Sequence, residues 1–400
     1  MILILFFLWR IFDLAAAGLA TRVIPYLGFF PYKEIFADYR LPHLVTGWAN
    51  FDGAQYLLIV REGYNQFTQA YFPLYPLLVK AVSLVVSNQL LSGLFISNAS
   101  FVVGLYFFRQ YLVGTGEETS PLQAIAFLLI FPTSFFFGAL YTEGLFFLLL
   151  VLVLYGLQRK KYRLVAIAGF LAALTRLIGV FLIIPIGLRM IQNQMAKTQG
   201  KNYGSRLKNI NPVSCFIKSL TTNFYLLTPL LGLLAYMFYL WKTTADPLFF
   251  FHSQPVFGAN RSTHLILLPQ VYFRYLKILL TAAWNFQYFV SAIEFLVFNF
   301  FLFILMIYGV KSWQRFKGKN FRLWLLTENV GLMLFSLVNL LLPTLTGTFS
   351  SVPRYALMSL TVFIYLGQIK TESVKIMVAI AFIVLHLVTL GYFIQGYFIG

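Results

Sequence analysis

The sequence predicts an all-α, polytopic integral membrane protein that forms a single domain over residues 1–400. Three observations support this fold class. The composition is 60% hydrophobic and only 10% charged, whereas about a quarter of the residues of a soluble protein are charged. Long apolar runs recur along the chain, with a mean hydropathy of +0.80, as expected for several membrane spans. Basic residues cluster in short loops between these runs, as the positive-inside rule predicts.

The net charge of +18 does not indicate nucleic-acid binding, because the basic residues lie in the loops between apolar runs. Cys215 is the only cysteine, which excludes an intrachain disulfide and a cysteine-based metal cluster. The opening "MILILFFLWRIFDLAAAGLA" has no basic segment before its apolar run and no convincing cleavage site. We therefore interpret it as a first span that the protein retains.

Basic segments set the predicted orientation, and we expect four of them to face the cytoplasm: residues 158–163, 189–218, 311–322 and 370–375. The N-terminus is then inside, and the first span, 2–28, leads to a first external loop over residues 29–90. The apolar stretch 72–86 within this loop is short, and a full crossing there would reverse the orientation of the later loops. We predict that it is an interfacial or re-entrant helix.

The later apolar runs bring the prediction to about eleven spans, with the C-terminus outside. These runs are 91–112, 122–140, 142–158, 163–175, 177–191, 221–241, 287–309, 322–341, 354–369 and 374–394. A cytoplasmic loop (192–220) and an external loop (242–285) separate some of them. The pair 163–175 and 177–191 is too short to cross about 30 Å of hydrocarbon twice without tilting, and short helices of this kind line buried or wet cavities.

Polar and proline-rich stretches gather on the predicted external side, where loops on a rigid scaffold often carry the functional site. The chain has only twelve acidic residues, and Asp52 and Glu143 fall on this side. An Asp-x-Asp pair, the usual metal clamp of enzymes that use nucleotide sugars, is missing. None of the four histidines is paired at metal-ligand spacing, so we expect no metal site.

Arg176 and Arg354 are basic residues on the predicted external side, against the general trend. An arginine at the hydrocarbon boundary is costly and needs a partner, which is either an acidic side chain or an anionic ligand. The planar fork of arginine matches the oxygens of a phosphate group. For both residues a structural ion pair is the alternative, and for Arg176 so is snorkelling to the interface.

The stretch "GWANFDGAQYLLIVREGY", residues 47–64, is a polar interruption in an apolar region. Residues 51–62 are expected to form a helix along the membrane surface. Asp52 stands at the start of this helix, where it has two compatible roles. It can cap the helix by accepting backbone N–H bonds, or it can belong to a functional site.

These residues resemble a known family. "WANFDGAQYLLIVREGY" is similar to the first-loop motif of PIG-V-type mannosyltransferases, glycosyltransferase family 76 of the GT-C superfamily. Further similar segments follow in the order of that family: "YFPLYPLLVK" (71–80), "FPTSFFFGALYTEGLFFLLL" (131–150), "GFLAALTRLIGVFL" (169–182), "SSVPRYALMSLTVFIYLG" (350–367) and the ending "YFIQGYFIG". The departures are Phe51, where the family often has Trp, and Gly144, where it often has Ser. We interpret both as conservative for a catalytic role.

The resemblance implies a GT-C fold and a glycosyltransferase whose site lies on the extracytoplasmic face. The donor would be a polyprenyl- or dolichyl-phosphate-linked sugar, typically mannose, and the acceptor a glycolipid or another glycan. We expect an inverting displacement that needs neither a metal ion nor a cofactor. The enzyme would be embedded among membrane lipids. The membrane is the plasma membrane in a prokaryote, which the compact loops favour, or the endoplasmic reticulum in a eukaryote.

Under this interpretation Asp52 is the base that takes the proton of the acceptor hydroxyl. Arg354 and Arg176 hold the donor phosphate, and Glu143 orients the acceptor or pairs with one of these arginines. Further residues expected to line the sugar and acceptor site are Tyr71, Tyr75, Tyr355 and Gln55. Two other functions stay open: a transporter that flips lipids or glycans, and a ligase that joins lipid-linked glycan polymers.

Overall fold

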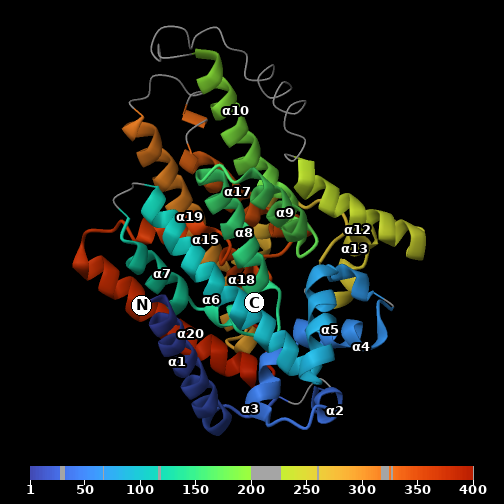
Figure 1. Cartoon of the computed structure of the whole chain (residues 1–400). Helices are drawn as coiled ribbons and strands as arrows, with labels where there is room; N and C mark the ends of the chain where they lie inside the picture. Colours follow the sequence, from blue (N-terminus) through green and yellow to red (C-terminus); the bar gives the residue numbers. More distant parts are fainter. Residues whose placement is uncertain are drawn as a thin grey trace.

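The computed structural model describes residues 1–27, 32–65, 67–115, 119–199, 227–258, 261–316, 324–325 and 328–399. All the regular elements in these ranges are helices (Figure 1), in agreement with the predicted all-α class. The predicted loop 192–220 and the start of the predicted span 322–341 lie largely outside the described residues. α10 (Ile183–Gln199) continues into the first part of that predicted loop.

Five stretches among the described residues are long and apolar enough to cross a membrane, since about 20 residues of helix span the hydrocarbon. They are α1 (Ile2–Val23), α6 (Gln89–Gly114), α15 (Phe286–Arg315), the stretch 329–346 and α20 (Glu372–Ile394). The stretch 329–346 consists of α17 (Glu328–Leu341) and η8 (Leu342–Thr346). The structure is therefore that of a helical membrane protein.

Several other helices are apolar but short. They are α5 (Leu74–Val86), α7 (Pro121–Ile130), α8 (Glu143–Gln158), α9 (Tyr162–Ala173), η4 (Leu177–Leu182) with α10, and α12 (Thr228–Thr244). The separate short helix expected at 72–86 is present as α5. Figure 1 shows α2 to α5 at one end of the molecule and the end of α10 at the opposite end.

Two predicted spans are wrong as continuous helices. The run 122–140 ends as α7 at Ile130, because the residue before Pro132 is pushed out of the helical region, and the 3-10 helix η3 (Ser134–Phe137) follows. The run 354–369 is divided into α18 (Val352–Ala356) and α19 (Leu360–Leu366). Hydropathy alone predicted both runs and does not register these breaks.

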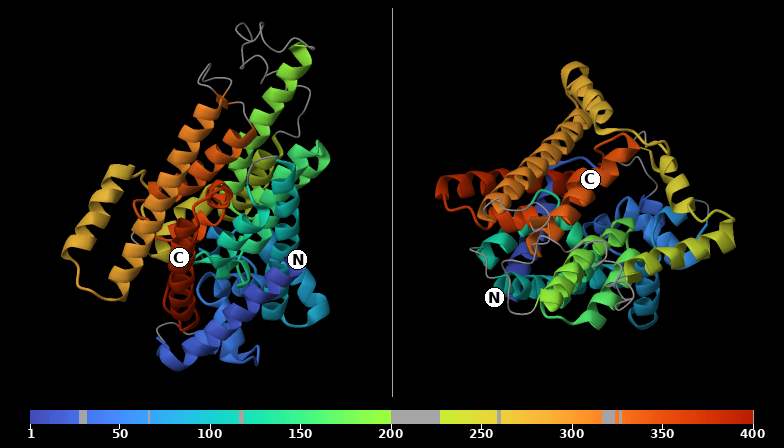
Figure 2. Two further views of the ribbon diagram at one scale, coloured as in Figure 1. Left: turned by 90° about the vertical axis from the view of Figure 1, so that its left-hand side faces the viewer. Right: turned by 90° about the horizontal axis from the view of Figure 1, so that it is seen from above.

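The predicted external loops contain helices of their own. The first loop holds α2 (Tyr32–Ala37), α3 (His43–Thr46), η1 (Gly47–Ala49), α4 (Asp52–Glu62), η2 (Thr68–Ala70) and α5. The loop 242–285 holds α13 (Phe249–His252), η7 (Gln254–Phe257) and α14 (Leu268–Thr281). The predicted external loop therefore includes a helix that was not predicted, α14, which forms a hairpin with the first part of α15 at the edge of the molecule (Figure 2).

A buried aromatic segment at η3 connects the spans to the first loop. Phe137 stacks on Phe101 of α6 with ring centroids 4.2 Å apart, and the backbone N–H of Leu140 donates to the carbonyl of Trp48 at 2.9 Å. Asn50 donates to the carbonyls of Phe393 and Ile394 at the end of α20. These contacts hold the residues immediately before α4 in place.

Gly144 permits the close packing of α8 on its neighbours. A Cβ atom at this position would meet the carbonyl oxygens of Ser97 and Phe137, and backbone atoms cannot move aside as a flexible side chain can. The glycine at a position where the family often has serine thus has a packing reason in this chain, and its effect on catalysis stays a prediction. The position requires glycine for steric reasons.

We expect Gly144→Ala to reduce the free energy of unfolding by about 1–3 kcal/mol, because overpacking against backbone costs that much. The control is Gly18→Ala in α1, where a Cβ atom would meet nothing within 4 Å and alanine stabilises a helix by about 0.5–1 kcal/mol. Thermal unfolding of the two purified variants measures the difference. An unfolding temperature of Gly144→Ala at or above that of the wild type would contradict the packing argument.

Candidate active site

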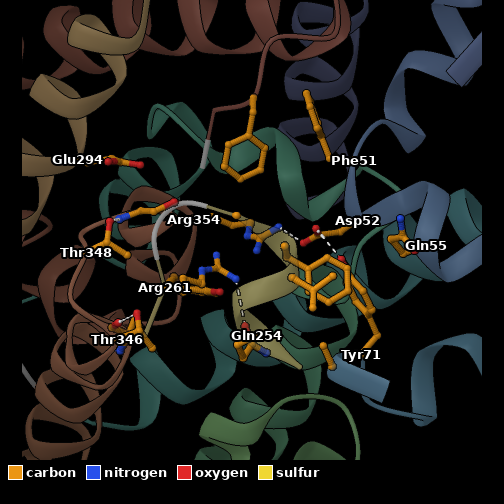
Figure 3. Close-up of a pocket in the computed structure, with 18 of the residues that line it drawn as sticks. Phe51, Asp52, Gln55, Tyr71, Gln254, Arg261, Glu294, Thr346, Thr348 and Arg354 are labelled. Carbon is orange, nitrogen blue, oxygen red and sulfur yellow. Dashed lines mark hydrogen bonds and ion pairs between the residues drawn. The ribbon is translucent and has the colours of Figure 1, made fainter. Parts of the chain in front are cut away.

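A cavity of about 2000 Å³ lies between the first-loop helices, the start of α8, α14 and the region around α18 (Figure 3). Seven of the eight predicted site residues line it: Asp52, Gln55, Tyr71, Glu143, Arg176, Arg354 and Tyr355. Tyr75 does not line it. Its ring is fully buried between α5 and α6, where its hydroxyl contacts the Gly93 carbonyl at 3.0 Å and Ser97 Oγ at 2.8 Å. The prediction that Tyr75 lines the sugar site was wrong.

The centre of the cavity is an ion pair between Asp52 and Arg354, 302 residues apart in sequence. Arg354 Nη1 donates to Asp52 Oδ2 at 2.5 Å, and the Tyr71 hydroxyl donates to Oδ1 at 3.1 Å. The Asp52 side chain is 24% exposed and that of Arg354 is 7% exposed. The carboxylate is therefore the part of this pair that an incoming molecule reaches more easily.

Two effects act on the pKa of Asp52. Burial alone would raise it, but the charge and hydrogen bond of Arg354, the charge of Arg261 and the hydrogen bond from Tyr71 together outweigh burial. The pKa of Asp52 is therefore held below its ordinary value. Burial and the neighbouring carboxylate raise the pKa of the Tyr71 hydroxyl well above its usual value, so this group stays protonated and donates.

The helix-cap interpretation of Asp52 was wrong. Asp52 is the first residue of α4, the cap residue is Phe51, and no side chain caps the helix. Phe51 has φ 59° and ψ −114°, a conformation that costs a non-glycine residue about 1–3 kcal/mol. Gly53 follows because a Cβ atom there would approach the Leu140 carbonyl to 3.2 Å. The Asp-Gly step thus allows α4 to begin against the η3 segment.

Glu143 is buried at the start of α8 and joins the two predicted arginines. Its Oε1 accepts from Arg176 Nη1 and lies 3.5 Å from Arg354 Nε, which agrees with the predicted alternative of an ion pair. Arg176 also donates to Thr142 Oγ1 at 3.4 Å. At this centre two carboxylates therefore face two guanidinium groups, and the charges balance.

The second oxygen of Glu143 is unused by the protein. Oε2 is buried and has no hydrogen-bond partner among the described residues. A buried acceptor without a partner costs about 1–3 kcal/mol, and such sites are often explained by a bound group. Glu143 lines the cavity, so this unsatisfied acceptor lies next to the space in which a ligand would bind.

Aromatic rings enclose the Arg354 guanidinium. Its carbon lies 5.3 to 5.5 Å from the ring centroids of Tyr355, Tyr141 and Phe136, within the range of cation–π attraction. The Tyr141 hydroxyl also accepts from the Asp52 backbone N–H at 3.3 Å. The same hydroxyl donates to the Asn50 carbonyl. These rings pack around the guanidinium beside its contact with Asp52.

Sequence reasoning missed the cations at the other end of the cavity. Arg261, Arg274 and Lys277 line it together with Glu294 and Tyr275, so Arg176 and Arg354 are not the only basic residues in the predicted external loops that reach the site. Arg274 and Lys277 lie one helical turn apart on α14. The periodicity of residues 268–281 was the signal that could have identified them.

The described residues contain no group of three His, Cys, Asp or Glu side chains that could hold a metal ion. The cations that these residues present to the cavity are arginine and lysine side chains. A phosphate group bound here would therefore meet guanidinium and ammonium groups.

No protein-family model, curated protein or solved structure matches the chain. The family resemblance of the motifs therefore stays a prediction. What the chain does has to be argued from the geometry of this cavity.

We expect Glu143→Gln to reduce the free energy of unfolding by about 3–5 kcal/mol, because it leaves two buried guanidinium groups with too little negative charge. The matched control is Asp246→Asn, which removes a carboxylate from the exposed pair with His252 and is expected to cost less than about 1 kcal/mol. Denaturant unfolding of the purified variants measures both values. Equal losses for the two variants would contradict the assigned role of Glu143.

Proposed function

We propose that the chain is a polytopic membrane glycosyltransferase with a GT-C fold of about eleven spans. It transfers a sugar, mannose by the motif resemblance, from a polyprenyl- or dolichyl-phosphate donor to a glycolipid or glycan acceptor on the extracytoplasmic face. The main support is the partly exposed Asp52 carboxylate, paired with Arg354 inside a large cavity. We assign the carboxylate of this pair as the base and its guanidinium as the group that binds the donor phosphate.

The cavity suits such substrates in shape and chemistry. A volume of about 2000 Å³ exceeds the roughly 300–1,000 Å³ of sites for drug-sized ligands, as two lipid-linked substrates require. Tyr71, Tyr355 and Phe257 line it, and aromatic rings of this kind cover the apolar faces of sugars. Arg354 supplies the fork that matches phosphate oxygens.

The transfer is a single displacement with inversion. An acceptor hydroxyl oxygen forms a bond to the anomeric carbon while the bond from that carbon to the phosphate oxygen breaks. Asp52 takes the hydroxyl proton, and the electron pair of the broken bond leaves with the lipid phosphate. Arg354 stabilises the charge that develops on this phosphate. Arg176 pairs with Glu143, and we assign the second oxygen of Glu143 to a hydroxyl of the acceptor sugar.

The ion pair makes Asp52 a weak base until the donor binds. A donor phosphate competes with Asp52 for the Arg354 guanidinium. As the guanidinium turns to the phosphate, the attraction that lowers the pKa of Asp52 weakens, and the pKa rises. Asp52 therefore becomes a stronger base when a substrate is present.

We expect Asp52→Asn to lower the rate of sugar transfer by about 10²- to 10⁴-fold, which is the usual contribution of a general base, while the protein stays folded and inserted. The same substitution at Asp38, an exposed first-loop carboxylate paired with Arg61, should leave the rate unchanged. The assay uses a labelled lipid-phosphate mannose and identifies the product by mass spectrometry. Near-normal turnover of Asp52→Asn would refute the assignment.

The transporter alternative has one observation in its favour. Asp13 in α1 is fully buried and contacts His386 Nε2 in α20 at 2.8 Å and Arg10 Nη1 at 3.2 Å, and ionisable groups inside spans often mark transport paths. Reconstitution in vesicles separates the two functions. Movement of the lipid-linked sugar across the bilayer without transfer would support the transporter, and transfer to an acceptor would support the enzyme.

The pH dependence of transfer should differ between the free enzyme and its complex with donor. Because the pKa of Asp52 is lowered, the ionised base persists above that pKa and is lost only as the pH falls through it. The acid limb of kcat/KM, which reports the free enzyme, should therefore lie below the ordinary pKa of an aspartate. The acid limb of kcat, which reports the complex, should lie at a higher pH. If the acid limbs of kcat/KM and kcat coincide, the donor phosphate does not compete with Asp52 for Arg354.

A further inference from the structure

The charges of the cavity balance at one end and not at the other. Around Asp52 and Arg354, two carboxylates face two guanidinium groups. At the α14 end three cations, Arg261, Arg274 and Lys277, face one carboxylate, Glu294, which accepts from the Tyr275 hydroxyl at 2.5 Å. This end therefore carries an excess of positive charge inside a cavity, where an anionic ligand is strongly attracted.

Two of these cations are held in place by neutral groups. Arg261 donates to Gln254 Oε1 at 3.0 Å and to Ser351 Oγ at 3.3 Å, and Arg274 donates to the Gly347 carbonyl at 2.9 Å. No ion pair joins Arg261, Arg274 or Lys277 to a carboxylate within the part of the chain that the structure describes. These guanidinium groups are thus positioned but not neutralised.

Gly347 is shaped for its contact with Arg274. It has φ +93°, and a Cβ atom there would lie 2.6 Å from Arg274 Nη1. A side chain at this position would therefore both strain the backbone and displace the guanidinium. The hydrogen bond to the Gly347 carbonyl orients the Arg274 guanidinium.

The sides of α14 differ in character, as the rotation of about 100° per residue predicts. Val271 and Tyr275 face the protein and are buried. Arg274 and Lys277 form the next stripe and line the cavity. Beyond them lies an exposed apolar stripe made of Phe273, Leu276 and Leu280, which are 67%, 46% and 82% exposed. The cationic stripe therefore separates the cavity from an apolar outer surface.

The outer stripe lies where a bilayer is expected. α14 is followed by Trp284, which is 89% exposed and stacks on Tyr288, and then by α15, one of the five helices long enough to span a membrane. Exposed tryptophan and tyrosine are typical of the boundary between lipid and water. α14 lies at the edge of the molecule (Figure 2), so its exposed apolar stripe is suited to contact lipid chains at that boundary.

We propose that Arg261, Arg274 and Lys277 form a second phosphate site, which takes the phosphate ester of a lipid whose chains lie along the outer stripe of α14. Figure 3 shows Arg261 between the Asp52–Arg354 pair and Thr346 and Thr348, so the site adjoins the catalytic centre without being part of it. The inference goes beyond the proposed function, because it requires binding and no transfer.

The test uses the full chain in neutral detergent and three probes: dioctanoyl phosphatidic acid, dioctanoylglycerol and inorganic phosphate. Calorimetric titration should show that phosphatidic acid binds the wild type more tightly than the other two probes do. In Arg274→Gln/Lys277→Gln we expect its affinity to fall about tenfold or more, which is 1.4 kcal/mol. Arg61→Gln/Lys242→Gln, which removes two cations that do not line the cavity, should bind as the wild type does.

Three results would overturn the proposal. Unchanged affinity in Arg274→Gln/Lys277→Gln would exclude these residues as the site. Equal affinity for inorganic phosphate would exclude the lipid, and equal affinity for dioctanoylglycerol would exclude the anion. If the double variant does not fold, Lys277→Glu decides, since this exposed side chain tolerates substitution and charge reversal must weaken binding. If the wild type transfers no sugar, the proposed glycosyltransferase activity is refuted. The binding result at Arg261, Arg274 and Lys277 is unaffected.

Discussion

The site depends on the burial of one guanidinium group. Arginine does not lose its charge in proteins, so Arg354, with a side chain 7% exposed, is tolerable only beside negative charge. Asp52 at the start of α4 and Glu143 at the start of α8 provide it. Three segments far apart in sequence therefore meet at one point. The same charge that fixes the fold there also lowers the pKa of the carboxylate that we propose as the base.

Backbone strain accompanies this meeting point. α4 begins after Phe51 and α18 begins after Ser351, and both residues have a positive φ. Each such residue costs about 1–3 kcal/mol and persists only where its surroundings enforce it. The Asn50 side-chain amide, which donates to the Phe393 carbonyl, and the Trp48 carbonyl, which accepts from Leu140 N–H, hold the first turn. The bond from Thr133 Oγ1 to the Pro353 carbonyl at 2.7 Å holds the second. The rigid aromatic segment around η3 lies between them and supports both.

Hydropathy and charge predicted the helical membrane class and the separate helix at 72–86. They also predicted a site built from Asp52, Glu143, Arg176 and Arg354, because a charged side chain in an apolar chain needs a partner or a ligand. These signals did not predict where a span breaks, since Pro132 ends α7 through local sterics that a hydropathy window ignores. They did not orient side chains either, so Tyr75 was assigned to the cavity although it faces α6. Arg261 and α14 were missed because the external stretch 242–285 was predicted only as a loop, without a helix of its own and without site residues.

The two ends of the cavity exert different electrostatic forces on a ligand. Paired charges largely cancel at a distance, so the centre around Asp52 and Arg354 attracts an anion only when it is close enough to compete for the guanidinium. The unpaired cations of α14 act over a longer range, especially inside a cavity with low-dielectric walls. An anionic headgroup is therefore drawn first to the α14 end. Arg261, which lies between the two ends and adds to the field at Asp52, connects that first position to the balanced centre. The division of charge thus separates capture of a ligand from the step at Asp52, within one continuous cavity.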